Sequence, residues 1–295
     1  MSRSKRSDTT LDREAPLSND KPAASGAVWR WRIADLLIAS VLVALGSPAT
    51  RAASPTDTVI ANIELSKPFG SRSPWRLIAT QGPQVVDPVF GEGTVPGSVV
   101  LCLEKSSAGP CDPGLAAMPR TPADAGGWDA HNLEASKVVY PRGPSAPPLL
   151  LVRTASLRGA NGDQAVFTQL FVYRRASDRF AQIYGHLTGR NNNQEVRFIE
   201  SGPLEGGVVS VEPTDNSPFG FWVSVSKLTS AYTYVQVLRY RSATRYGDGN
   251  PLAVIDSEMP NIESRLGLQR RGAPLPLPAA PCPRPRLTGM ELWCN

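Results

Sequence analysis

Short runs of β-branched and aromatic residues dominate the chain from about residue 57 onward. The clearest is the segment 221–226, in which Phe, Val and Val alternate with Trp, Ser and Ser. A period of two places alternate side chains on opposite faces of an extended chain. This segment therefore predicts a half-buried β-strand with Phe221, Val223 and Val225 on its inner face.

Similar runs recur along the chain, and Gly-Pro or Pro-Gly pairs of the kind found in turns separate the first of them. We expect strands within 59–61, 75–79, 97–101, 149–152, 167–173, 180–184, 196–199, 208–211, 221–226 and 234–241. No helical stripe of about twelve residues appears, and one short helix is predicted at Pro260–Leu266. The pattern predicts an all-β fold, an antiparallel sandwich or a related β-meander architecture.

Two stretches differ in composition from this β-rich body. Residues 105–147 are rich in Pro, Gly, Ala and Ser, which predicts a long surface loop with one short strand at Lys137–Tyr140. Residues 272–295 begin as a Pro-rich tail, whose composition favours extended polyproline II that wraps the surface. The alternative is a ligand for a proline-reading module. We divide the chain into a leader at 1–52, a β-rich domain at 53–271 and the tail at 272–295.

The leader has the features of a secretory signal. Arg30 and Arg32 precede an apolar run at Ile33–Leu45, and small residues follow up to Ala52. We predict cleavage after Ala52 and a periplasmic or secreted mature protein. The alternative is an uncleaved anchor in the inner membrane, but a span of about 20 apolar residues is the norm and Asp35 interrupts this run. A start at Val28 would give a leader of ordinary length.

The charge balance bears on the class of partner. The chain has 31 Lys and Arg against 26 Asp and Glu, of which residues 1–52 contain 8 and 5. The part after Ala52 therefore keeps 23 basic and 21 acidic side chains. Proteins that bind nucleic acid usually carry a large basic excess, so we expect no nucleic-acid partner.

All four cysteines follow the leader and form two close pairs along the chain. An even count after a signal peptide favours disulfides, and local pairing gives Cys102–Cys111 and Cys282–Cys294. Zinc is the alternative, but eight and eleven intervening residues do not match the usual spacing of zinc ligands.

The acidic residues near the Tyr246–Asn250 loop are the main candidates for chemistry. Asp248, Asn250, Asp256 and Glu258 offer oxygen ligands that suit a hard cation such as calcium. The plainer interpretation is a Gly-rich turn. Asp256 and Glu258, two apart, would share one face if the chain is extended there. The same carboxylates, with Glu263, are candidates for the acid pair of a glycosidase.

Aromatic and amide side chains in the same block suggest a second kind of site. Tyr184, Trp222, Tyr232 and Tyr234, with Asn192 and its neighbours, have the planes and amides that suit a sugar. The alternative is that these aromatic rings are core or cross-strand pairs.

Two further patterns give little support for an enzyme. Ser224 and Lys227 match an S-x-x-K spacing, but in a strand they point to opposite faces, whereas that chemistry needs a helical turn. His131 and His186 are the only histidines, and we expect both on the surface or in turns. The sequence predicts an exported, non-catalytic protein that binds an envelope component, either protein or glycan. The alternative function is a carbohydrate-active hydrolase, and calcium is the one cofactor considered.

Overall fold

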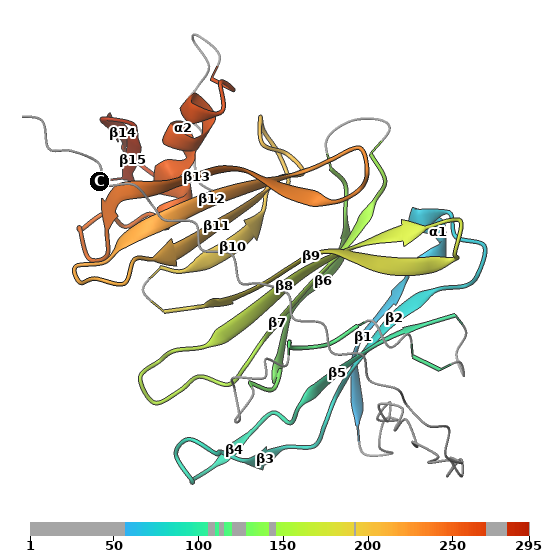
Figure 1. The fold of residues 1–295 in the computed structure, drawn as a ribbon. Coiled ribbons are helices and arrows are strands. Elements are labelled where there is room, and N and C mark those ends of the chain that lie inside the picture. The colour runs from blue at the N-terminus through green and yellow to red at the C-terminus, as the bar shows by residue number, and fades with distance from the viewer. Residues whose placement is uncertain are drawn as a thin grey trace, which may run out of the picture. The chain divides into compact units, whose positions relative to one another are not determined.

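The computed structural model describes residues 57–105, 110–111, 115–119, 128–141, 146–191, 193–269 and 282–294. They all belong to one compact unit, Ala49–Asn295. Antiparallel sheets make up most of this unit, so the predicted all-β class is confirmed (Figure 1). The predicted signal peptide and the Pro-rich stretch 272–281 lie outside the described residues. None of the helices in the described part has the length and hydropathy needed to cross a membrane.

The first sheet has the strand order β1-β2-β5 and is formed by β1 (Thr58–Glu64), β2 (Arg76–Gln81) and β5 (Val99–Glu104). The short helix α1 (Ser66–Phe69) follows β1, and a small hairpin of β3 (Val85–Val86) and β4 (Thr94–Val95) follows β2.

The middle sheet is an uninterrupted meander of four strands. It is formed by β6 (Asn132–Val139), β7 (Leu149–Ala155), β8 (Ala165–Arg174) and β9 (Arg179–Gly189). Strand β8 is almost wholly buried, because Phe167 and Phe171 pack toward the first sheet while Leu170 and Val172 join a second cluster with the third sheet. Burial on both faces explains why the sequence of β8 shows a continuous apolar run rather than alternation.

Asp178, in the turn between β8 and β9, is hydrogen-bonded to the segment that leads into β2 of the first sheet. Its carboxylate accepts hydrogen bonds from the Ser73 hydroxyl at 2.5 Å, the Trp75 indole N–H at 3.0 Å and the Tyr173 hydroxyl at 2.7 Å. These three donors hold the pKa of Asp178 well below its ordinary value. The turn therefore stays bound to the first sheet as long as this carboxyl is ionised.

The third sheet has the strand order β10-β11-β12-β13. Its strands are β10 (Glu195–Phe198), β11 (Val208–Pro213), β12 (Gly220–Leu228) and β13 (Tyr234–Arg245). Phe221, Val223 and Val225 are fully buried, as the alternation in β12 predicts. They pack against helix α2 (Val254–Arg265), which covers one face of this sheet.

Helix α2 differs from the sequence expectation in where it begins. The predicted helix at Pro260–Leu266 starts instead at Val254 and includes Pro260 in its interior. Asp256 and Glu258 are therefore helical, and residues two apart on a helix do not share a face. The expectation that these two carboxylates lie together on an extended segment is wrong.

The C-terminal segment forms a hairpin of β14 (Pro285–Thr288) and β15 (Glu291–Cys294). Both predicted disulfides are present, with Cα–Cα distances of 4.9 Å for Cys102–Cys111 and 5.5 Å for Cys282–Cys294. Leu292 of β15 is fully buried and its carbonyl accepts a hydrogen bond from Asn250 at 2.9 Å. This end of the chain is therefore packed onto the molecule as well as covalently closed.

Candidate functional site

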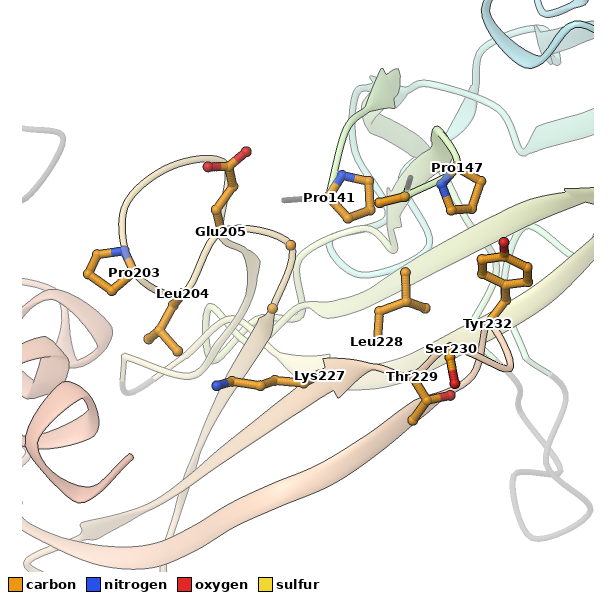
Figure 2. A pocket seen from close by; sticks show the side chains of 13 residues that line it. Pro141, Pro147, Pro203, Leu204, Glu205, Lys227, Leu228, Thr229, Ser230 and Tyr232 are labelled. Carbon is orange, nitrogen blue, oxygen red and sulfur yellow. The ribbon is translucent and has the colours of Figure 1, made fainter. Parts of the chain in front are cut away.

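A pocket of about 430 Å³ lies where three loops meet (Figure 2). Pro141 and Pro147 come from the connection between β6 and β7, and Pro203 to Gly207 from the connection between β10 and β11. The turn between β12 and β13 contributes Leu228 to Tyr232. Its volume is in the range of known ligand sites, and its walls are mainly apolar.

Tyr232 has an unusual backbone conformation in the turn between β12 and β13. Its φ of 57° is in the left-handed region, which side chains with a Cβ enter at a cost of about 1–3 kcal/mol. The turn is held by the Tyr232 N–H, which donates to the Thr229 carbonyl at 3.0 Å, and by the Arg174 guanidinium, which donates to the Tyr232 carbonyl at 3.3 Å. The same guanidinium lies 5.6 Å from the tyrosine ring centroid. A glycine would adopt this conformation without strain. The backbone conformation therefore does not explain why a tyrosine stands at this position.

Tyr234 is bonded to one wall of the pocket, and Tyr184 packs against Tyr234. The Tyr234 hydroxyl donates to the Gly206 carbonyl at 2.8 Å, which joins β13 to the loop that forms one wall. Its ring meets Tyr184 edge-to-face with centroids 5.5 Å apart. Burial raises the pKa of both hydroxyls, so both stay protonated and Tyr234 remains a donor across the ordinary pH range.

The predicted aromatic site is therefore divided. Tyr232 lines the pocket, whereas Tyr184 and Tyr234 are packed side chains that hold its wall. Trp222 lies on β12, 37% exposed, and does not line the pocket. Asn192 lies outside the described residues. The sequence reveals the aromatic residues but not the prolines that face them, because those come from loops some 30 to 90 residues away.

His186 and Glu212 form a pair that the sequence analysis did not connect. His186 Nε2 and Glu212 Oε1 are 2.5 Å apart, which links β9 of the middle sheet to β11 of the third. The hydrogen bond from His186 lowers the pKa of Glu212, and the charges of His186 and Arg239 act in the same direction against partial burial. Tyr184 stacks beside the imidazole, with ring centroids 6.3 Å apart. His131 lies elsewhere, its Nδ1 2.7 Å from the Pro96 carbonyl oxygen.

The candidate calcium ligands are engaged in separate interactions. Asp248 accepts from the backbone N–H of Asn250, and the Asn250 amide donates to Ser257 and to the Leu292 carbonyl. Asp256 forms an ion pair with Arg197, with Oδ1 2.5 Å from Nη1. In the described part of the chain, no three His, Cys, Asp or Glu side chains gather closely enough to hold a metal ion.

Glu258 is a fully buried carboxylate with a complete set of donors. It accepts from Tyr240 at 2.7 Å, Thr244 at 2.8 Å and Asn261 at 2.9 Å, and also from Ser242. Three of these donors are on β13, so Glu258 fastens α2 to the sheet. Glu263 is also buried, and burial raises the pKa of its carboxyl.

A second hollow of about 470 Å³ is bounded by Ile60, Gln81, Asn132, Leu133 and Glu134. Its polar groups already have partners within the molecule. The Gln81 amide donates to two backbone carbonyls, and Glu134 is paired with Arg190 at 2.6 Å. The pocket at Tyr232 is therefore the better candidate for a binding site.

The Ser224-x-x-Lys227 pair lies in β12, as predicted.

Comparison of the chain with family models, curated proteins and solved structures gives no match.

Proposed function

We propose that this protein is exported and non-catalytic, and that it binds a segment of an envelope protein in the pocket beside Tyr232. The observation that carries the proposal is the presence of a tyrosine at a left-handed backbone position in the lining of the apolar pocket. Strain of this kind is common where a side chain serves a ligand.

The two disulfides support the first part of the proposal. Disulfides persist in oxidising compartments and are rare in the cytosol of mesophiles. The described residues include both, and Cys102 lies within β5 itself. The predicted leader at residues 1–52 agrees with a site of action outside the cytoplasm.

The chemistry of the walls supports a protein segment over a neutral sugar. Pro147, Leu204 and Leu228 present carbon to the pocket, while Tyr232 adds an aromatic ring. Glu205 and Lys227 place one charge of each sign at the margin. An extended peptide with an apolar side chain would bury that side chain here and leave its polar backbone near the rim.

The hydrolase alternative has no such support. Asp256 is paired with Arg197, and Glu258 is buried between α2 and β13 with four donors. A glycosidase needs two carboxyl groups that face one another across a substrate cleft.

Site-specific crosslinking tests the proposal. The full chain, expressed with its own leader, carries a photoreactive amino acid at Ser230 in the pocket or, as a control, at Glu92 in the exposed β3–β4 loop. We expect one envelope protein to crosslink at Ser230 and not at Glu92, and the crosslink to weaken when Tyr232→Asn is added. Asn tolerates the left-handed backbone, so this variant removes the ring and keeps the turn. Equal crosslinking from both positions, or a crosslink unaffected by Tyr232→Asn, would contradict the proposal.

A further inference from the structure

The face of the third sheet that is opposite α2 carries a row of arginines. On β13, Tyr240, Ser242 and Thr244 are buried toward Glu258, so the residues that alternate with them, from 239 to 245, point the other way. Those residues include Arg239, Arg241 and Arg245, all exposed. Trp222 and Ser224 of β12 share this face, because Trp222 pairs with Arg241 and Ser224 with Arg239. We refer to these five residues as the arginine face.

The arginines of this face have no carboxylate partner in the described part of the chain. None of the ion pairs found there includes Arg239, Arg241 or Arg245. The acidic group on the same face of the sheet is Glu212, opposite Trp222, and it is already paired with His186. Asp215 in the β11–β12 loop and Asp248 after β13 are exposed near the Arg245 end. Arg239 and Arg241 therefore form no ion pair in the described part of the chain, although the charge of Arg239 acts on Glu212 and lowers the pKa of that carboxyl.

Trp222 lies between these arginines rather than in the core. Its ring is 37% exposed, and the Arg239 guanidinium lies 4.7 Å from the ring centroid. On the other side, the Arg241 side chain crosses Gly220, where a Cβ atom would lie 3.6 Å from Nε. Gly220 is itself buried, and the absence of a side chain there leaves room for Arg241 to lie across it. Together the residues form a platform with one aromatic ring, two guanidinium groups and the hydroxyl of Ser224.

We propose that the arginine face binds an acidic glycan, a polysaccharide that carries carboxylate groups. Guanidinium groups bind carboxylates through paired hydrogen bonds, and an indole ring supplies the flat apolar surface on which a sugar ring stacks. Arg239 and Arg241 project from the same side of β13 about 7 Å apart, so they contact separate anionic groups or clamp one between them. Ser224 donates to or accepts from a sugar hydroxyl.

The observations favour a glycan over the other polyanions. Nucleic-acid binding depends on many phosphate contacts and a strong basic field, whereas residues 53–295 contain 23 basic against 21 acidic side chains. An anionic membrane surface would be met by Lys and Arg flanking apolar groups that insert. Here Trp222 is only 37% exposed beside the Arg239 guanidinium, and the exposed valines of β13, Val235 and Val237, lie at one end of the arginine row and not among the arginines. This inference concerns a different surface from the pocket and does not depend on it.

Calorimetric titration with defined probes tests the inference. The full chain, expressed with its own leader and purified from its compartment, is titrated with a galacturonate oligomer and with a neutral maltooligosaccharide of the same length. We expect binding to the galacturonate alone. The double variant Arg239→Gln/Arg241→Gln should weaken it by about tenfold or more, since each charged hydrogen bond contributes on the order of a tenfold change in affinity. Trp222→Ala should also weaken it.

The matched control is Arg158→Gln/Arg179→Gln, which removes two exposed arginines, one from the connection between β7 and β8 and one from β9. This control should change the affinity by less than about twofold, and so should Tyr232→Asn in the pocket. Circular dichroism and thermal unfolding show whether each variant is folded, and a folded Arg239→Gln/Arg241→Gln variant with unchanged affinity overturns the inference. So does an absence of galacturonate binding, equal loss in the control pair, or tighter binding to duplex DNA or phosphatidylglycerol vesicles. Because the crosslink at Ser230 is measured separately, failure here leaves the pocket proposal intact.

Discussion

His186 Nε2 lies 2.5 Å from Glu212 Oε1, and this contact joins the last strand of the middle sheet to the second strand of the third. The two sheets also share a cluster of buried apolar residues that includes Leu170 and Val196. The pair lies at the margin of that cluster, with the Glu212 side chain 41% exposed. It is therefore a hydrogen-bonded pair at a sheet–sheet junction, and both side chains are partly shielded from solvent.

We predict that Glu212→Gln destabilises the protein at neutral pH and that the effect fades in acid. The pKa of Glu212 is lowered in the folded state, chiefly by the hydrogen bond from His186. Its contribution is therefore present above the unfolded pKa of about 4.3 and is lost as pH falls through the lower folded value. Because the pair is partly exposed, we expect only about 0.5–1 kcal/mol.

Urea unfolding at pH 7 and pH 3 measures this difference. Glu92→Gln, in an exposed loop far along the chain, is the control and should show no pH-dependent change. A Glu212→Gln effect that is equal at both pH values would show that the carboxylate charge is not what stabilises the junction.

Substitution of Glu258 should lower the free energy of unfolding by more than substitution of Glu212. Glu258→Ala leaves the donors of Tyr240, Thr244 and Asn261 without this partner, and each buried donor left unsatisfied costs about 1–3 kcal/mol. We expect Glu258→Gln to cost less, because its amide oxygen still accepts two of these hydrogen bonds. The measurement is the free energy of unfolding in urea. Ser264→Ala, exposed on the same helix, should change it by less than about 0.5 kcal/mol.

The left-handed backbone at Tyr232 should make a glycine variant more stable than an alanine variant, which is the reverse of the usual order. At a φ of 57°, glycine is free of the strain that a Cβ imposes, so Tyr232→Gly should be more stable than Tyr232→Ala by about 1 kcal/mol. Thermal unfolding of the two variants measures the difference. At Ser230, two residues earlier and without a positive φ, the glycine variant should gain no such advantage over the alanine variant. The same order at both positions would mean that Tyr232 is not strained.

The strands were predictable because their signal is local. In β12 the alternation of apolar and polar residues is complete within six residues, and the structure places Val223 and Val225 in the core as the pattern indicates. Helix α2 was not predictable over its full length, because a polar residue interrupts the row of buried positions along it. Val254, Glu258 and Ile262 are all buried, and the middle position is polar. A buried glutamate is acceptable there because Asn261 of α2 and three side chains of β13 donate to it, and the sequence does not show the pairing with β13.

The pocket was missed for a similar reason. Its walls come from three connections that are far apart in sequence, and prolines such as Pro141 and Pro203 read simply as loop residues. Tyr232 was selected for its ring, but its backbone angle was not predictable without the turn. The cysteine pairing succeeded because proximity along the chain and proximity in space coincide for both pairs.

The two disulfides should differ in what they protect. A bridge that closes a loop of about ten residues contributes roughly 2–3 kcal/mol in the chain-entropy model. Cys102 lies in β5 between the buried residues Leu101 and Leu103, so removal of this bridge acts directly on the first sheet. Cys102→Ala/Cys111→Ala should therefore lower the global free energy of unfolding.

Cys294 ends β15, which remains held by buried Leu292 and by the Asn250 hydrogen bond to its carbonyl. Cys282→Ala/Cys294→Ala should instead raise proteolysis within residues 282–288 while β15 and the core stay protected. Limited proteolysis with mass mapping, alongside urea unfolding of the same proteins, separates a local effect from a global one. Early cleavage inside the third sheet of the second variant would show that the C-terminal bridge stabilises the whole molecule and that the packing of Leu292 does not suffice.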